Sequence, residues 1–277
     1  MLLGVHCSVS GGLEKAFDEA ADLGINTMQI FSRNQRQWNA KPISDEEQKA
    51  YTTAGKNSDV KISFSHCSYL INLAAENVDN RNKSIAALQA EVERCSLLGL
   101  SYCVLHPGAA GSQDFSTAVA KIAEGLNIVL KGTDGSKVMI LLENTAGQGT
   151  SVGGEFENLL EIKKLVTGNR IGYCFDTCHA YASGFDMRTE KGTTETFKKF
   201  DKILGIENLK VFHLNDSKGD LGTHLDRHEH IGKGKLGLEP FRFIMNQFPG
   251  IPKIIETPKE DNWDKVNLNL LRSLVKK

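Results

Sequence analysis

Eight short apolar runs recur along this chain, each bounded by glycine or polar residues and followed by a longer amphipathic stretch. This change of period, from a strand pattern to a helix pattern, is typical of a βα unit. Apolar runs that alternate with helices predict parallel strands covered on both faces. The predicted strands are LLGVHCS (2–8), NTMQIFSR (26–33), VKISFSHC (60–67), YCVLHPG (102–108), VMILLEN (138–144), IGYCFDT (171–177), LKVFHLND (209–216) and PKIIETP (252–258).

Helical patterns fill the segments between these runs, and glycine follows several of them, as it does at many helix ends. They cover 13–24, 44–56, 82–100, 116–132, 155–166, 195–205, 238–248 and 263–276. Eight such units at this length fit a closed (β/α)8 barrel, the TIM barrel, better than an open sheet. Because the sequence shows no linker or low-complexity tract, we expect a single domain over residues 1–277.

Composition limits the class of protein only broadly. The formal net charge of -1 argues against strong nonspecific adhesion to polyanions, although a locally basic face or bound cations can still attract nucleic acid. Six cysteines in 277 residues are too sparse for a disulfide scaffold, so we expect reduced core thiols. Since neither a signal peptide nor an apolar span of ~20 residues is found, we expect a cytoplasmic protein without a membrane partner. We further expect a monomer, which no feature of the sequence decides.

Polar side chains that can bind metals end six successive runs. In a barrel of this kind the active site lies at the carboxyl ends of the strands, so these side chains can converge although they are far apart in sequence. The six are His66, His106, Glu143, Asp176, His213 and Glu256, and the loops after the sixth and seventh runs add His179, Asp226 and His228. Nine imidazoles and carboxylates are too many for one ion and suit two or three, with zinc favoured and manganese as the alternative.

Each of these residues has a plainer interpretation when taken alone. A single strand histidine is more often a hydrogen-bonded core residue, and a single strand-terminal acid often caps the next helix. Six such coincidences on successive strands are far less expected, so we interpret the cluster as functional. Cys174 and Cys178 need not be ligands, His6 is interpreted as a supporting residue, and His224 and His230 as solvated loop residues.

The segment GKGKLG (232–237) formally matches the G-x-G-x-x-G fingerprint of dinucleotide-binding proteins. It follows a histidine-rich loop instead of a strand and lacks a βαβ context. We therefore predict a turn before the eighth helix and no nucleotide cofactor.

Seven segments carry a resemblance to a known family: SHCSYLINLA, LHPG, LLENTAGQG, FDTCHAYASGFD, FHLNDSK, DRHEHIGKGKLG and IIETP. Through them, nearly the whole chain resembles the endonuclease IV family of apurinic/apyrimidinic (AP) endonucleases. The resemblance implies a TIM barrel with a trinuclear zinc site that cleaves double-stranded DNA 5′ to an abasic site, leaves a 3′-hydroxyl and serves base excision repair. Removal of 3′-blocking groups is a further expectation.

The resemblance also implies how the nine residues divide among three ions. As the carboxylate shared by two ions, Glu143 is the candidate catalytic residue that orients the attacking water. The implied sets are His66, His106 and Glu143 for the first ion, Glu143, Asp176, His213 and Glu256 for the second, and His179, Asp226 and His228 for the third.

Two segments resemble the DNA-penetrating loops of the family, SRNQRQW (32–38) and CSYLINL (67–73). The resemblance implies that Arg36, Tyr69 and Leu70 fill the gap in the base stack at an abasic site. Residue chemistry alone would assign Tyr69 and Leu70 to the core.

Two other functions remain open from the residues. A metal-dependent sugar isomerase or epimerase also places acidic residues and histidines at the strand ends of a barrel, but usually needs fewer imidazoles. A metal-dependent DNA-binding protein without catalysis would bind abasic duplex and leave it intact.

Overall fold

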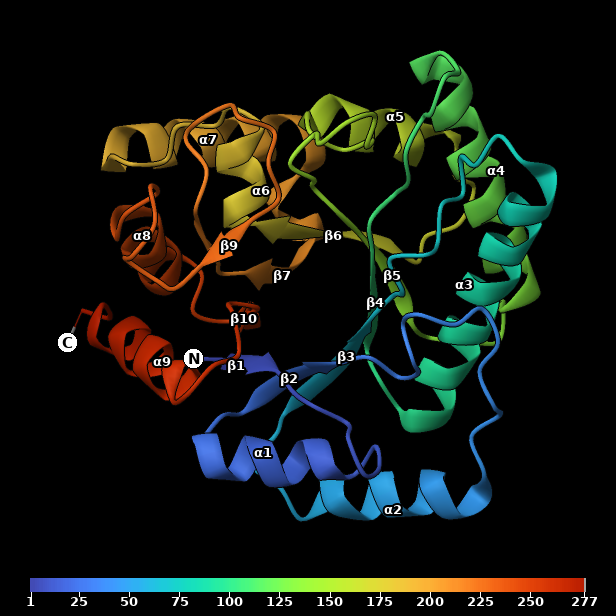
Figure 1. The fold of residues 1–277 in the computed structure, drawn as a ribbon, viewed down its shortest axis with the longest axis horizontal. Helices are drawn as coiled ribbons and strands as arrows, with labels where there is room; N and C mark the ends of the chain where they lie inside the picture. The colour runs from blue at the N-terminus through green and yellow to red at the C-terminus, as the bar shows by residue number, and fades with distance from the viewer. Residues whose placement is uncertain (277) are drawn as a thin grey trace.

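Every predicted run contains a strand, and the strands pair in parallel to close a ring in the order β1-β10-β7-β6-β5-β4-β3-β2 (Figure 1). This confirms the TIM barrel. The structure, a computed structural model, describes residues 1–276. The barrel strands are β1 (Leu3–His6), β2 (Thr27–Ile30), β3 (Ile62–His66), β4 (Tyr102–Leu105), β5 (Met139–Glu143), β6 (Ile171–Asp176), β7 (Leu209–His213) and β10 (Lys253–Ile255).

Helices surround the ring of strands, as Figure 1 shows. They are α1 (Lys15–Leu23), α2 (Asp45–Lys56), α3 (Val78–Leu98), α4 (Phe115–Gly132), α5 (Phe156–Leu165), α6 (Thr177–Ala182), α7 (Glu190–Leu204), α8 (Glu239–Gln247) and α9 (Trp263–Ser273), with a 3-10 turn at Ile206–Asn208. Within residues 1–276, no helix is long and apolar enough to cross a membrane.

The structure corrects several predicted boundaries. Helices α3 and α7 begin four or five residues before the predicted starts because capping side chains extend them. Asn77 accepts a hydrogen bond from the backbone N–H of Asn80 at 2.9 Å, and Thr189 accepts one from that of Gly192 at 3.1 Å. The short helix α6 was not predicted, nor was the antiparallel pair β8 (Asp216–Ser217) and β9 (His228–Glu229).

Two layers of apolar side chains build the core. The larger lies between the strands and the surrounding helices, and the smaller fills the barrel. Tight filling of the interior makes the barrel a packed core and leaves its carboxyl end as the rim where chemistry can occur. The interior layer consists of Phe64, Val104, Leu141, Cys174, Val211 and Ile254.

Candidate metal centre

The predicted ligands at the strand ends form the next layer of side chains beyond the interior layer, toward the carboxyl end of the barrel. Side chains two residues apart on a strand point to the same face, so each residue that follows an interior one by two positions also faces the barrel axis. This places a ring of imidazoles and carboxylates directly above the core. The successive pairs are Phe64 and His66, Val104 and His106, Leu141 and Glu143, Cys174 and Asp176, Val211 and His213, and Ile254 and Glu256.

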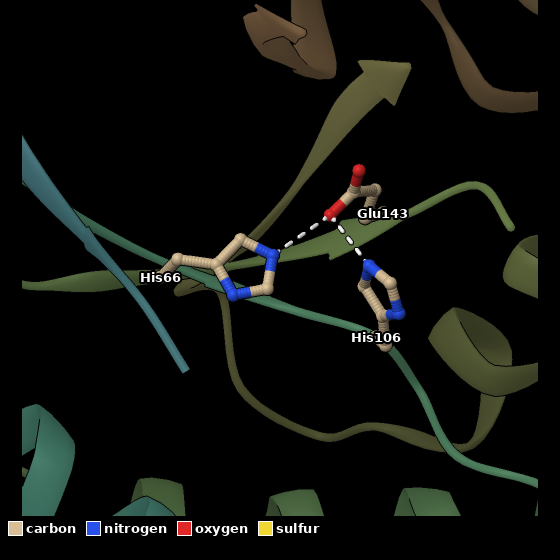
Figure 2. A group of neighbouring side chains, drawn as sticks. All are labelled: His66, His106 and Glu143. Carbon is tan, nitrogen blue, oxygen red and sulfur yellow. Dashed lines mark hydrogen bonds and ion pairs between the residues drawn. The ribbon is translucent and has the colours of Figure 1, made fainter. Parts of the chain in front are cut away.

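Glu143 lies at the middle of this ring and is fully buried. Its Oε2 lies 3.2 Å from Nε2 of His66 and 3.1 Å from Nε2 of His106 (Figure 2). Its Oε1 lies 2.9 Å from Nδ1 of His213 and 3.3 Å from Nδ1 of His179. The two oxygens of one carboxylate therefore contact separate groups of imidazoles, which is the geometry of a bridging ligand.

A second group forms around His213. Its Nδ1 lies 3.2 Å from Oε2 of Glu256 and 3.9 Å from Oδ2 of Asp176. Asp176 also caps α6, because its Oδ1 accepts the backbone N–H of His179 at 2.8 Å. The turn predicted between Asp176 and His179 is thus the first turn of a helix, and the plainer interpretation of Asp176 as a cap holds together with its place in the cluster.

A third group lies beside the second. Oδ1 of Asp226 is 3.2 Å from Nε2 of His179 and 3.3 Å from Nε2 of His228. Nε2 of His228 is also 3.8 Å from Oδ2 of Asp176, so the second and third groups adjoin. As the i,i+2 spacing predicts, Asp226 and His228 project to one side of their segment, and β9 holds that segment against β8.

Hydrogen bonds on the far side of three rings fix their tautomers. Nδ1 of His66 lies 2.7 Å from the carbonyl oxygen of Cys67, Nδ1 of His179 lies 3.0 Å from that of Asn144, and Nδ1 of His228 lies 3.1 Å from that of Glu256. A carbonyl oxygen only accepts, so Nδ1 carries a proton in each ring, and in the neutral ring the lone pair of Nε2 faces the cluster. This arrangement is typical of metal-binding histidines.

Two observations show that the residues fit metal ions. Nε2 of His179 and of His228 is buried and lies near Oδ1 of Asp226, but neither makes a hydrogen bond of normal geometry within residues 1–276. This is costly unless another species meets the nitrogen. The ligand atoms of the first group lie within 4.8 Å of one another, as do those of the third. Ligands about 2.0–2.2 Å from one ion lie at most roughly 4.4 Å apart, so small side-chain movements bring each group onto an ion. The nine predicted ligands offer nitrogen and oxygen, as zinc or manganese accepts, and the thiols of Cys174 and Cys178 lie beside them.

The ionisation of the site bears on metal binding. Burial acts to raise the pKa of Glu143, but the attraction of His213 and His106 and hydrogen bonds from His106 and His179 hold it well below the usual value. Burial acts to lower the pKa of His179, but nearby Asp176 and Asp226 raise it well above normal. The carboxylate of Glu143 is thus held ionised, which is the form that binds a metal, and a metal ion on His179 would take the place of its extra proton.

Polar residues that sequence reasoning missed hold these ligands in place. Gln29 is buried in β2, accepts a hydrogen bond from Nε2 of His213 at 2.8 Å, and contacts Nδ1 of His6 at 2.9 Å and Oε1 of Glu256. Its only signal in the sequence is that it is a polar residue in an apolar run. His6 accordingly supports the cluster from β1, as predicted, and lies 3.7 Å from Oε1 of Glu256.

Two asparagines align the ends of neighbouring strands. Asn144 pairs with the backbone of Asp176 through both its side-chain atoms, at 2.8 and 3.1 Å. Asn215 donates to Oδ2 of Asp176 at 2.6 Å and accepts the backbone N–H of Glu256 at 2.8 Å. Each asparagine therefore ties a ligand of one strand to the next strand, and both lie one or two residues after a predicted ligand.

Comparisons with known proteins place the chain in a family. Residues 17–274 match the family described as xylose isomerase-like TIM barrel. The protein named "Probable endonuclease 4" from Chloroflexus aurantiacus is 46% identical over 277 residues, which cover 98% of this chain and 97% of that protein. The crystal structure of endonuclease IV from Thermus thermophilus superposes with a TM-score of 0.89 at 34% identity and covers 99% of this chain and 98% of that one. The chain belongs to the endonuclease IV family.

Proteins with little sequence identity to this endonuclease IV family member have the same barrel fold. A D-tagatose 3-epimerase-like protein superposes with a TM-score of 0.78, covering 99% of this chain and 97% of that one. Its sequence identity is 20%, so the likeness extends to the fold alone. The fold by itself does not separate a nuclease from a sugar epimerase, and the side chains must do so.

In this endonuclease IV family member the loops expected to meet DNA are exposed at the rim. Tyr69 is 60% and Leu70 is 37% exposed, which contradicts the core assignment that residue chemistry alone suggests. The ring of Tyr69 lies 5.2 Å from that of His66 and 5.5 Å from that of His106. Arg36 is also exposed, in the loop between β2 and α2.

The two histidines that flank the third group, His224 and His230, differ in exposure. The prediction of a solvated loop residue is wrong for His230, because the loop after β9 folds back onto α9. Its ring is buried and stacks on Trp263 with the centroids 4.0 Å apart, and its Nδ1 meets the side chain of Asn267 at 3.2 Å. His224 is exposed as predicted, although its Nδ1 lies 3.0 Å from the carbonyl oxygen of Ala146.

The cysteines and the glycine-rich segment are arranged as the sequence suggests. All six cysteines are buried and free within residues 1–276. The segment 232–237 forms turns before α8, and the carboxylate of Asp216 accepts the backbone N–H groups of Gly232, Gly234 and Leu236 at 2.9–3.0 Å. Gly234 thus serves close approach to a buried carboxylate, while Gly232 and Gly237 have positive φ angles that favour glycine.

Proposed function

We propose that this chain is a DNA-repair hydrolase that cleaves the phosphodiester bond 5′ to an abasic site in double-stranded DNA and leaves a 3′-hydroxyl. The observation that carries the proposal is the convergence of nine imidazoles and carboxylates at one rim of the barrel. Sequence identity of 46% over nearly the full length with a protein named "Probable endonuclease 4" supports it. Base excision repair is the process in which such a cut is needed.

The three groups of side chains are assigned to three zinc ions, with manganese as the alternative metal. When bound, such ions activate water for attack on phosphorus and offset charge on the phosphate and the leaving oxygen. The sets are His66, His106 and Glu143, then Glu143, Asp176, His213 and Glu256, then His179, Asp226 and His228.

Glu143 is the candidate catalytic residue. Its two oxygens face the first and the second group, and its buried carboxylate is held ionised by the neighbouring imidazoles. An ionised carboxylate at this point accepts a hydrogen bond from the attacking water and orients its lone pair toward phosphorus. Because Glu143 is fully buried, bulk water does not compete for the same hydrogen bond.

The exposed loops suit DNA with a missing base. Moving a nucleotide out of the duplex costs a few kcal/mol and is easiest where the base is already lost. Tyr69 and Leu70 stand at the rim beside the histidines and can occupy the space that the base leaves. A pocket of about 430 Å³ beside them, lined by Tyr69, His106, Gln148 and Asp226, can receive the extruded sugar and phosphate.

A second pocket, of about 480 Å³, lies between the loops after β1 and β2. Arg36 and Lys259 line it together with Ser8 and Ser10. Cationic and hydroxyl side chains are those that bind DNA phosphates and set the register of a protein on the duplex. Arg36 is thus assigned to the DNA-binding surface with Tyr69.

The test uses the metal-loaded protein and a labelled duplex with one abasic site, beside the same duplex without it. The expected result is one cut 5′ to the abasic site, with a 3′ end that a polymerase extends, and no cut in the intact duplex. Glu143→Gln should leave the abasic strand uncut while binding persists. An uncut abasic strand with wild-type protein refutes the proposal.

Two outcomes would identify the rivals. Interconversion of a ketose and an aldose by the same protein, without strand cleavage, would support the sugar isomerase suggested by the shared barrel. Tight binding to abasic duplex with no cut would support a DNA-binding protein. The third group of His179, Asp226 and His228 favours the nuclease, because sugar isomerases usually need fewer imidazoles.

A further inference from the structure

Three of the six cysteines meet outside the proposed centre. Cys67 directly follows β3, Cys103 lies in β4 and Cys95 lies in α3, and Sγ of Cys67 is 3.1 Å from Sγ of Cys103. The ligand atoms of Glu91, Cys95 and Cys103 lie within 4.8 Å of one another. None of these four side chains, which we name the thiol cluster, is more than 1% exposed.

The strand register argues against a disulfide between the two closest thiols. Cys103 pairs with Ser65, so Cys67 stands two residues further along the neighbouring strand. Two residues along a strand and one strand across separate the Cα atoms by about 8 Å. A disulfide needs roughly 4.4–6.8 Å, so the two thiols can touch but cannot be bridged without moving the backbone.

Glu91 is unusual in this setting. Its carboxylate is buried beside the thiols, and its Oε2 has no hydrogen-bond partner within residues 1–276. The nearest cation is Nε of Arg33 at 3.5 Å, which itself lacks a hydrogen bond in the described chain. A buried carboxylate that is incompletely paired is costly, and a bound cation would remove that cost.

The charges around the thiol cluster are compatible with a divalent cation. Burial raises the pKa of the Cys67 and Cys95 thiols, so they stay neutral until a metal displaces their protons. Three thiolates and one carboxylate would then carry four negative charges, of which a divalent ion offsets two. Arg33, which contacts Glu91, offsets a third.

We propose that the thiol cluster is a second metal site that takes a thiophilic divalent cation, zinc or its analogue cadmium. Glu91, Cys95 and Cys103, whose ligand atoms lie within 4.8 Å of one another, supply three ligands, and Cys67, whose Sγ contacts that of Cys103, supplies the fourth by rotating toward them. Each thiol gives up its proton to solvent on binding. Zinc at about 2.3 Å from each sulfur holds the sulfurs about 3.8 Å apart, so Cys67 and Cys103 would move slightly apart from the observed contact.

The consequence for the molecule is a link between three elements. The ion would join α3, β3 and β4 behind the rim, since Glu91 and Cys95 lie within α3, Cys103 lies within β4 and Cys67 directly follows β3. Arg33, which contacts Glu91, also donates to the carbonyl oxygen of Trp38 at 3.0 Å in the loop that carries Arg36. Binding to the folded state alone would stabilise the protein.

Cadmium chloride added to the zinc-loaded protein tests the proposal, because thiolate ligands give an ultraviolet charge-transfer band that nitrogen and oxygen ligands do not give. Wild type should show the band and one more bound ion per chain than Cys103→Ala. It should also show a rise in melting temperature that Cys103→Ala lacks. Cys7→Ala, which removes a buried cysteine outside the thiol cluster, should behave as wild type.

Absence of the band from wild type at saturating cadmium overturns the proposal, and so does an undiminished band in Cys103→Ala. Circular dichroism shows whether each variant folds, and Cys95→Ser replaces Cys103→Ala if the latter does not. No DNA is used, so the outcome is independent of the proposed nuclease activity.

Discussion

Oδ2 of Asp216 accepts the backbone N–H of Gly234 at 3.0 Å, and this bond closes the loop that begins with two of the proposed metal ligands. The same carboxylate holds Gly232 and Leu236, while Ser217 pairs with His228 across β8 and β9. The position of the third group therefore depends on a carboxylate that is not itself a ligand.

Gly234→Ala should loosen this loop. A Cβ at this position would lie 2.5 Å from Oδ1 of Asp216 and would clash with the carbonyl oxygen of Ser217. We expect a loss of about 1–3 kcal/mol in the free energy of unfolding, as for other overpacked sites, and fewer metal ions per chain by elemental analysis. Gly250→Ala is the matched control, because a Cβ there has no neighbour within 4 Å among the described residues. Equal metal content in the two variants would contradict the prediction.

Gln29→Ala should weaken metal binding although Gln29 is not itself a proposed ligand. Gln29 orients His213 and contacts Glu256, and removing such a support typically costs 10–100-fold in metal affinity or activity. Competition with a chelator measures the affinity. Gln48→Ala removes a surface glutamine that bonds the carbonyl oxygen of Leu97, and it should leave affinity unchanged. A Gln29→Ala protein that keeps wild-type affinity would remove the proposed supporting role.

Tyr69→Ala should weaken binding to abasic DNA and leave the free energy of unfolding almost unchanged. Stacking of an aromatic side chain on a base contributes about 1–3 kcal/mol, so binding to abasic duplex should weaken by roughly 5- to 150-fold. Because Tyr69 is 60% exposed, the free energy of unfolding should change by no more than about 0.5 kcal/mol. Val78→Ala, at a residue that is 68% exposed near the start of α3, serves as the control in a fluorescence anisotropy titration. Unchanged affinity in Tyr69→Ala would exclude insertion of this ring.

Lys253→Met should change how stability depends on pH. Burial lowers the pKa of Lys253 in β10 to about 8, while an unfolded lysine titrates near 10.4. Between these values the unfolded chain binds more protons than the folded one, so this lysine makes stability rise with pH across that window and adds no slope below it. From pH 7 to pH 10.5 the free energy of unfolding of wild type should therefore rise by up to about 3 kcal/mol more than that of Lys253→Met.

Urea unfolding at a series of pH values measures this difference. Lys61→Met, at an exposed lysine, is the control and should follow wild type. A constant difference between wild type and Lys253→Met across the range would show that the buried amine has no such role. Lys253 donates to the carbonyl oxygens of Phe248 and Ile251, so the variant also loses those hydrogen bonds at every pH.

The parts of the fold set by periodicity could be predicted from the sequence. All eight strands lie within the predicted runs, and the ligands that end them converge because residues at a strand end share one rim. Local capping was harder to foresee. Asn77 and Thr189 start their helices outside the amphipathic pattern, and Asp176 opens α6 while facing the cluster.

Contacts between distant segments could not be predicted, because they depend on which loops meet. His230 resembles its loop neighbours in sequence but is covered by Trp263. Gln29 lies far from His213 along the chain and becomes its partner only when the barrel closes. The side chain of Tyr69 is apolar enough for a core but is exposed, because its exposure depends on how the loop after β3 is arranged.

Closure of the barrel has a consequence for when the proposed centre can form. The predicted ligands begin at His66 and end at Glu256, and β10, the strand that precedes Glu256, joins β7 to β1. A growing polypeptide or a proteolytic fragment that stops before β10 has neither the complete ring nor its last carboxylate. The full set of predicted ligands therefore exists only once the polypeptide extends through residue 256.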